Sequence, residues 1–225
     1  MRLKGEEGII GIMKLKVNIP RSKQLTGSYC GPAVFEMLVS SLGKTVYQEA
    51  IVDASEAREK VMKVGITLNE LSKGLAKLHP DLKVWGKTNS KLDDVQKLLE
   101  LGYPVAVDWQ GIFTRDEYED DEYDKWGDFW DRMTGAPVLK GDQGHYCVAL
   151  EIDLKKGYLR FADPYGHYAG KDRFVALWEF EERWWDDRID KDERGRKKYV
   201  LENRLMFLIT TKEDKFPATL GMSKV

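Results

Sequence analysis

The sequence is poor in cysteine and histidine and has no long apolar run. Its 225 residues include only two cysteines and three histidines. So few thiols and imidazoles exclude a disulfide-stabilised secreted scaffold and a zinc site built from several Cys and His clusters. The N-terminus lacks the apolar segment of a secretory signal, and no uncharged run approaches the roughly 18 residues that cross a membrane. We therefore expect a cytoplasmic protein with no membrane partner.

An excess of charge of one sign is also absent. The chain has 36 basic and 38 acidic residues, a formal net charge of −2, so no overall positive field would attract nucleic acid. Hydrophobic residues make up 42% of the chain and include 7 Trp, 10 Tyr and 8 Phe, which is enough for a folded core. Internal repeats and low-complexity linkers are missing too. We predict a single domain over residues 1–225.

Helical patterns occupy the first half of the chain and strand patterns the second half. Apolar residues recur at helical spacing in three segments, 33–42, 67–80 and 91–101. Thr67 and Glu70 have the spacing of a capping box at the start of the second segment. Short β-branched or aromatic runs predict strands over 12–19, 104–109, 146–152, 158–162 and 205–210. This order indicates an α+β fold with the helices packed on one side of an antiparallel sheet.

Two charged segments look like additions to this fold. The first is an acidic, aromatic insertion at about 111–143, in which residues 113–131 carry nine acidic and only two basic residues, a net charge of −7. It is either a lid that selects cationic or extended peptides or a solvated helix that packs Trp126 and Trp130 inward. The second segment, about 179–198, mixes both signs and suggests a solvated helix or an extended hairpin.

Cys30 stands at the predicted start of the first helix, followed by Gly31 and Pro32 in the first turn. The positive end of the helix dipole favours the thiolate, which is the nucleophilic form of cysteine. The alternative is a small buried core residue, the usual role of a cysteine.

His145 and Asp163 are predicted neighbours although 18 positions separate them. His145 begins one strand, Asp163 ends the next, and Lys155 to Gly157 suggest the hairpin turn between the two strands. In an antiparallel hairpin the start of one strand lies beside the end of the other. An imidazole backed by a carboxylate is the orienting half of a catalytic triad. Gln24, six residues before Cys30, could direct its amide at an oxyanion together with the backbone N–H of Cys30.

The ordered set of Gln24, Cys30-Gly31-Pro32-Ala33, Gly144-His145-Tyr146 and Asp163-Pro164 resembles a known family. It is similar to the papain-like peptidases that cleave double-glycine leaders from bacteriocin precursors, peptidase family thirty-nine, and especially to its stand-alone members. The resemblance spans about residues 24–180. It departs from papain itself, because the local papain signature around the cysteine is absent and Asp163 stands where papain-type sites use asparagine.

The resemblance implies a papain-like fold, in which an N-terminal helix bearing the nucleophile packs on an antiparallel sheet. It further implies a thiol hydrolase that cleaves a peptide or amide bond through an acyl-enzyme on Cys30. His145 would be the base, Asp163 its orienting group and Gln24 part of the oxyanion hole. We expect substrate contacts from Gly144, Trp109, Trp126 and Trp130, and a peptide or protein as substrate.

The sequence is also compatible with other assignments of the same residues. A Cys-His-Asp set also serves acyltransferases of the transglutaminase or acetyltransferase type, and the fold could act as a non-catalytic peptide-binding module. Cys30, His145, Cys147 and Asp163 have ligand types suited to a metal. Such a site would leave Gln24 and the position of Cys30 unexplained, so we expect no metal and no cofactor. Cys147 lies two residues from His145 on the same strand and is expected to pack in the core.

Overall fold

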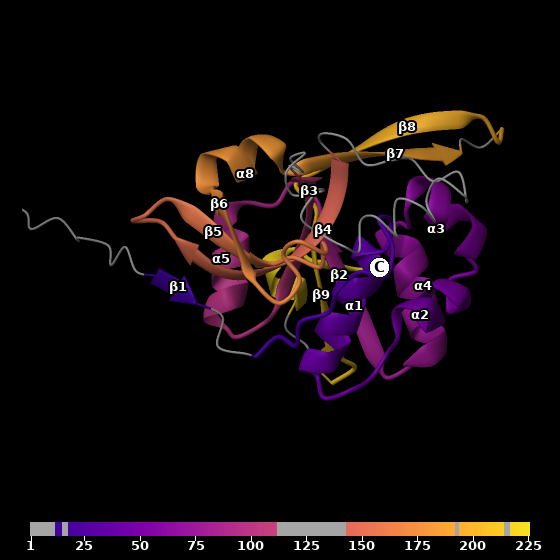
Figure 1. The fold of residues 1–225 in the computed structure, drawn as a ribbon, viewed down its shortest axis with the longest axis horizontal. Coiled ribbons are helices and arrows are strands. Elements are labelled where there is room, and N and C mark those ends of the chain that lie inside the picture. The colour runs from indigo at the N-terminus through magenta and orange to yellow at the C-terminus, as the bar shows by residue number, and fades with distance from the viewer. Residues whose placement is uncertain (1–11, 15–17, 112–142, 192–193, 214–216) are drawn as a thin grey trace, which may run out of the picture.

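The computed structural model describes residues 12–14, 18–111, 143–191, 194–213 and 217–225. In these residues the fold is built on an eight-stranded sheet, in which all pairs are antiparallel, and a separate two-stranded hairpin (Figure 1). The sheet has the order β10-β2-β9-β3-β4-β5-β6, and β1 pairs with β4 beside this path. The strands of the sheet are β1 (Ile12–Lys14), β2 (Leu82–Lys87), β3 (Val105–Gly111), β4 (Gln143–Asp153), β5 (Tyr158–Ala162), β6 (Asp172–Ala176), β9 (Met206–Thr211) and β10 (Ser223–Lys224).

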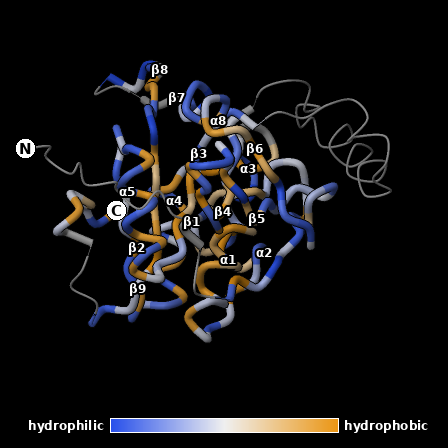
Figure 2. The backbone as a smooth tube through the Cα atoms, turned by 90° about the vertical axis from the view of Figure 1, so that its left-hand side faces the viewer, coloured by the Kyte–Doolittle hydropathy of each residue, from blue (hydrophilic) through white to orange (hydrophobic). Residues whose placement is uncertain are grey.

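Helices cover both faces of the sheet, so the prediction that they pack on one side is wrong. The helices are α1 (Cys30–Ser41), α2 (Gln48–Ala54), α3 (Arg58–Val64), α4 (Leu68–Leu78), α5 (Leu92–Glu100) and α8 (Leu177–Arg183), with a 3-10 turn at Pro217–Leu220. Apolar residues from α1, α2, α3 and α4 pack on one face and form what we call the α1-side core. Residues from α5 and α8 pack on the other face and form the α5-side core. Figure 2 shows apolar colouring concentrated in the central strands and α1.

Alternation along β4 divides its side chains between these two cores. Tyr146 and Val148 belong to the α1-side core, whereas Cys147 and Ala149 belong to the α5-side core. A strand buried on both faces has no polar face, which explains why 146–152 appears in the sequence as a nearly continuous apolar run.

The predicted helices are present, as are the strands predicted over 104–109, 146–152, 158–162 and 205–210, whereas the strand predicted over 12–19 is confirmed only at Ile12–Lys14. The capping box is confirmed, since Glu70 donates its backbone N–H to Thr67 and its carboxylate accepts the backbone N–H of Thr67. The hairpin of β4 and β5 is confirmed, with Asp153 opposite Tyr158. The first helix begins at Cys30, as predicted.

The second charged segment, 179–198, contains the last part of α8 and a hairpin of β7 (Trp185–Lys191) and β8 (Lys197–Asn203). The hairpin contacts β3 and β4 through β7 and projects from the sheet in Figure 1. Of the two interpretations, the hairpin therefore applies to most of the segment. The predicted insertion lies almost entirely outside the described residues, apart from its ends in β3 and β4. No helix in the described part of the chain is both long enough and apolar enough to cross a membrane.

Candidate active site

His145 and Asp163 are in direct contact, as the hairpin predicted. His145 is the third residue of β4, and Asp163 directly follows β5. Nε2 of His145 donates to Oδ1 of Asp163 over 2.7 Å, and both residues are buried, at 3% exposure each. With Nε2 as the donor, the neutral imidazole carries its lone pair on Nδ1. The carboxylate therefore fixes both the ring orientation and the tautomer, as a triad requires.

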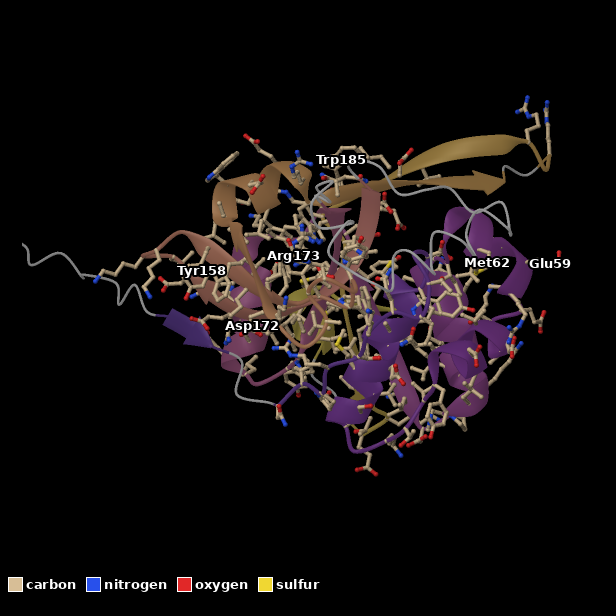
Figure 3. All side chains as sticks on the ribbon, in the orientation of Figure 1. Glu59, Met62, Tyr158, Asp172, Arg173 and Trp185 are labelled. Atoms are coloured by element: carbon tan, nitrogen blue, oxygen red, sulfur yellow. The ribbon has the colours of Figure 1, made fainter. Side chains whose placement is uncertain are left out.

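Arg173 is a third member of this array and was not predicted from the sequence. Arg173 lies on β6, opposite Phe161 of β5, and its Nη1 donates to Oδ2 of Asp163 over 2.8 Å. The backbone N–H of Tyr165 donates to Oδ1 of Asp163 over 2.8 Å. In Figure 3 the labelled Arg173 lies in the interior of the molecule. Asp163 is thus held by one cation, one imidazole and one backbone amide.

These contacts set the protonation of both partners. Burial by itself would raise the pKa of Asp163, but the charges and hydrogen bonds of His145 and Arg173 outweigh it and hold that pKa well below its usual range. Burial by itself would lower the pKa of His145, but the Asp163 carboxylate, together with a smaller contribution from Cys147, raises it well above its usual value. The array therefore favours an imidazolium beside a carboxylate.

The expectation that Trp109 contacts substrate is wrong, because its side chain is fully buried. Trp109 stands opposite His145 on β3 and stacks on Phe161 with ring centroids 5.5 Å apart. The guanidinium of Arg173 lies over the Trp109 ring at 5.1 Å and over the Tyr168 ring at 4.4 Å. Trp109 thus forms an apolar wall that orders Arg173 and excludes water from the carboxylate.

Cys30 is the first residue of α1 and is half-buried. The first turn of α1 packs closely on β4, since a Cβ added to Gly31 would lie 3.1 Å from the ring of Tyr146. Tyr146 is the neighbour of His145, so the helix start bearing Cys30 reaches β4 at the position of the predicted base. The His145–Asp163 array lies on the α5-side face of β4 and α1 on the opposite face. The pairing of Cys30 with His145 therefore stays a prediction.

Gln24 is buried and is tied to the same region. Its backbone N–H donates to the carbonyl of Pro164, which follows Asp163. Its side-chain Nε2 donates to the carbonyls of Thr26 and Gly27 over 2.9 and 3.1 Å. Both amide hydrogens are thus used within the loop before Cys30. For Gln24 to stabilise an oxyanion, at least one of these two hydrogen bonds must break so that the amide can donate to the oxyanion instead.

Cys147 is fully buried, which confirms the prediction that it packs in the core. Burial raises the pKa of its thiol to about 11, so it remains protonated at neutral pH. His145, Cys147 and Asp163 place potential metal-ligand atoms within 4.8 Å of one another, a cluster that does not include Cys30. Their donors suit a metal poorly, because the Asp163 carboxylate already accepts bonds from His145 and Arg173 and the Arg173 cation occupies its second oxygen.

Of the remaining predicted contacts, Gly144 precedes His145 and is exposed. A Cβ at this position would collide with the carboxylate of Asp186 on β7 unless that side chain turned away. Trp126 and Trp130 lie outside the described residues.

Solved structures share this fold. The peptidase domain of Streptococcus ComA, a bi-functional ABC transporter involved in a quorum sensing pathway, matches at a TM-score of 0.51 and 15% identity, over 87% of this chain and 100% of that one. A putative C39-like peptidase from Bacillus anthracis matches at 0.51 and 15%, over 88% and 98%. The chain thus has the predicted α+β, papain-like fold. No curated protein matches the sequence. A model of the Peptidase_C39 like family matches residues 16–188, so the predicted resemblance is confirmed and the protein belongs to that family.

Proposed function

We propose that the protein is a cysteine peptidase that cleaves a peptide bond through an acyl-enzyme on Cys30. The observation that carries this proposal is the buried His145–Asp163–Arg173 array at the end of β4, beside the helix start that bears Cys30. An imidazole whose orientation is fixed by a buried carboxylate is the arrangement that general acid–base catalysis uses.

In this mechanism the Cys30 thiolate attacks the carbonyl carbon of the scissile peptide bond. The first amides of α1 have no intrahelical acceptors, and the N–H of Cys30 stabilises the oxyanion. The side-chain amide of Gln24 becomes a second donor to the oxyanion when it gives up one of its hydrogen bonds to the carbonyls of Thr26 and Gly27. His145 protonates the leaving amine, then removes a proton from the water that releases the acyl group from sulfur. Asp163 keeps the imidazole oriented throughout.

The reactivity of the two thiols tests the nucleophile without knowledge of the substrate. At pH 7, iodoacetamide should label Cys30 and leave Cys147 unlabelled in intact protein, as measured by peptide mass spectrometry, because Cys147 is buried and protonated. His145→Ala should slow the labelling of Cys30 about tenfold or more, since the imidazolium no longer stabilises the thiolate. An unchanged rate in His145→Ala would contradict the pairing.

Turnover tests the reaction itself. A library of short peptides incubated with the protein should show cleavage by mass spectrometry in the wild type and in Cys147→Ala, the matched thiol control. Cleavage should be lost in Cys30→Ala. Addition of a primary amine separates hydrolysis from acyl transfer, because a transferase would yield amide adducts in place of free acids. Equal cleavage by Cys30→Ala and the wild type would refute the proposal.

A further inference from the structure

Two acidic residues lie on the α1-side face of the sheet, on either side of His145 along the strand. Asp108 on β3 stands opposite Tyr146, and Gln110 stands opposite Gly144. Asp186, near the start of β7, packs its carboxylate against Gly144, and Nε2 of Gln110 donates to its Oδ1 over 2.8 Å. The two carboxyl groups therefore lie beside the residues that precede and follow the predicted base, on the side from which α1 presents Cys30.

Asp108 is the more deeply buried of the two, at only 2% exposure. Its Oδ2 is buried with no hydrogen-bond partner among the described residues. Burial raises the pKa of Asp108 well above its usual value, and the nearby charges of Asp186 and Cys30 raise it further. A buried carboxyl without a partner costs free energy, and such a group in a native fold calls for a functional explanation.

Asp186 also lies in an environment that disfavours its ionised form. Burial raises its pKa to about 6, and Glu202, its cross-strand partner on β8, adds a further negative charge. Within the described residues neither Asp108 nor Asp186 forms an ion pair with a lysine or arginine. Asp163, which directly follows β5 on the other face of the sheet, is as buried as Asp108 and does have a cation, Arg173. The α1-side acids thus lack a cation that would favour their ionised forms, within the described part of the fold.

We propose that Asp186 and Asp108 form a subsite that binds the side chain of a lysine or arginine residue in the substrate, next to the scissile bond. This inference rests on the proposed peptidase function and adds the class of substrate. Asp186, half-buried at the base of the β7–β8 hairpin, would meet the cation first, and Asp108 would lie further in. An arriving positive charge favours the ionised form of both carboxyl groups.

The chemistry of the pair favours an ammonium or guanidinium over a metal ion. Gln110 directs its Nε2, a donor, toward Asp186, so its oxygen is not offered as a ligand there. Two carboxylates alone fall short of the six to eight oxygens that calcium takes. A lysine or arginine side chain brings an apolar stem that can pack on the Tyr146 ring, which lies opposite Asp108.

The test compares matched peptides derived from a sequence that the wild type cleaves. At each position around the cleavage site, lysine is replaced by norleucine or arginine by citrulline, which removes charge at nearly constant shape. We expect kcat/KM to favour the charged peptide about tenfold at one such position. Asp186→Asn and Asp108→Asn should reduce this preference to about twofold or less. Asp187→Asn, a change at the exposed neighbour of Asp186, should leave it intact.

A binding measurement separates this inference from the proposed function. Fluorescence anisotropy with labelled lysine and norleucine peptides is carried out on Cys30→Ala, alone and combined with Asp186→Asn. Tighter binding of the lysine peptide that depends on Asp186 supports the subsite. If the wild type also cleaves no peptide, that second result refutes only the peptidase function. Cleavage without any preference for a basic residue, or a preference that survives both Asp→Asn changes, would overturn the subsite and leave the peptidase standing. Equal circular dichroism spectra verify that each variant is folded.

Discussion

Substitution of Asp163 by asparagine should destabilise the protein, although papain-type sites carry asparagine at the corresponding place. In this structure Oδ1 accepts bonds from His145 and from the Tyr165 backbone, and Oδ2 accepts one from Arg173. An asparagine that keeps the bonds to its oxygen turns its NH₂ group toward the Arg173 guanidinium, so that two donors face each other. Arg173, at 5% exposure, would then be a buried cation without its anion.

The expected loss of unfolding free energy follows from the burial of the Asp163–Arg173 ion pair. Removal of one partner from a buried ion pair costs about 3–5 kcal/mol, because the other charge stays desolvated. We expect Asp163→Asn to lose about 3 kcal/mol of unfolding free energy at pH 7. Addition of Arg173→Met, which keeps the packing on Trp109 and Tyr168, should restore at least half of this loss.

Urea unfolding followed by circular dichroism measures these free energies for the two single variants and the double variant. The pH dependence is a second constraint. Because the native pKa of Asp163 is lowered, its contribution is present above the unfolded value of about 3.9 and is lost only as the pH falls through the native value. Because Asp163 also raises the pKa of His145, and that contribution is fully present only below the unfolded histidine pKa of about 6.5, the loss should be at least as large at pH 5 as at pH 7. A single variant within 1 kcal/mol of the wild type, or a double variant no more stable than Asp163→Asn, would show that Arg173 does not depend on Asp163.

Two further changes test the packing around the site. Asp186→Asn should stabilise the protein by about 1–2 kcal/mol at pH 7 in urea titrations, because the native pKa of about 6 exceeds the unfolded value of about 3.9. Protonated Asp186 stabilises the wild type below pH 4, and this stability is lost as the pH rises through 6. The stability advantage of Asp186→Asn should therefore vanish near pH 4. An advantage that is the same at pH 4 and pH 7 would show that the pKa of Asp186 is not raised. Gly31→Ala should cost about 1–3 kcal/mol, because the new Cβ would lie 2.9 Å from Cδ1 of Leu71 and 3.1 Å from the Tyr146 ring. An unchanged thermal midpoint in Gly31→Ala would mean that α1 is not seated tightly on β4.

Features with a local cause could be predicted from the sequence. The capping box depends on Thr67 and Glu70 alone, three residues apart. The contact of His145 with Asp163 depends on one short turn, because antiparallel pairing then brings the start of β4 beside the end of β5. For the same reason the family resemblance could be recognised, since its motifs are short and occur in a fixed order.

Features that depend on the order of strands in the sheet could not be predicted. Trp109 has the composition of a substrate-binding aromatic, and only the stacking on Phe161 and Phe180 from later elements shows that it is buried. Arg173 lies in a charged stretch that reads as surface, and its burial follows from the pairing of β6 with β5. The approach of Asp186 to Gly144 joins residues 42 positions apart through a hairpin that pairs with no strand of the main sheet.

The two faces of β4 differ in how the acidic residues beside His145 are balanced. On the α5-side face, Asp163 favours the imidazolium and its own charge is balanced by Arg173. On the α1-side face, Asp108 interacts favourably with His145, but its Oδ2 has no hydrogen-bond partner among the described residues. A substrate cation can supply the missing partner, so an arrangement that is unfavourable for stability in the empty site becomes a means of recognising the substrate.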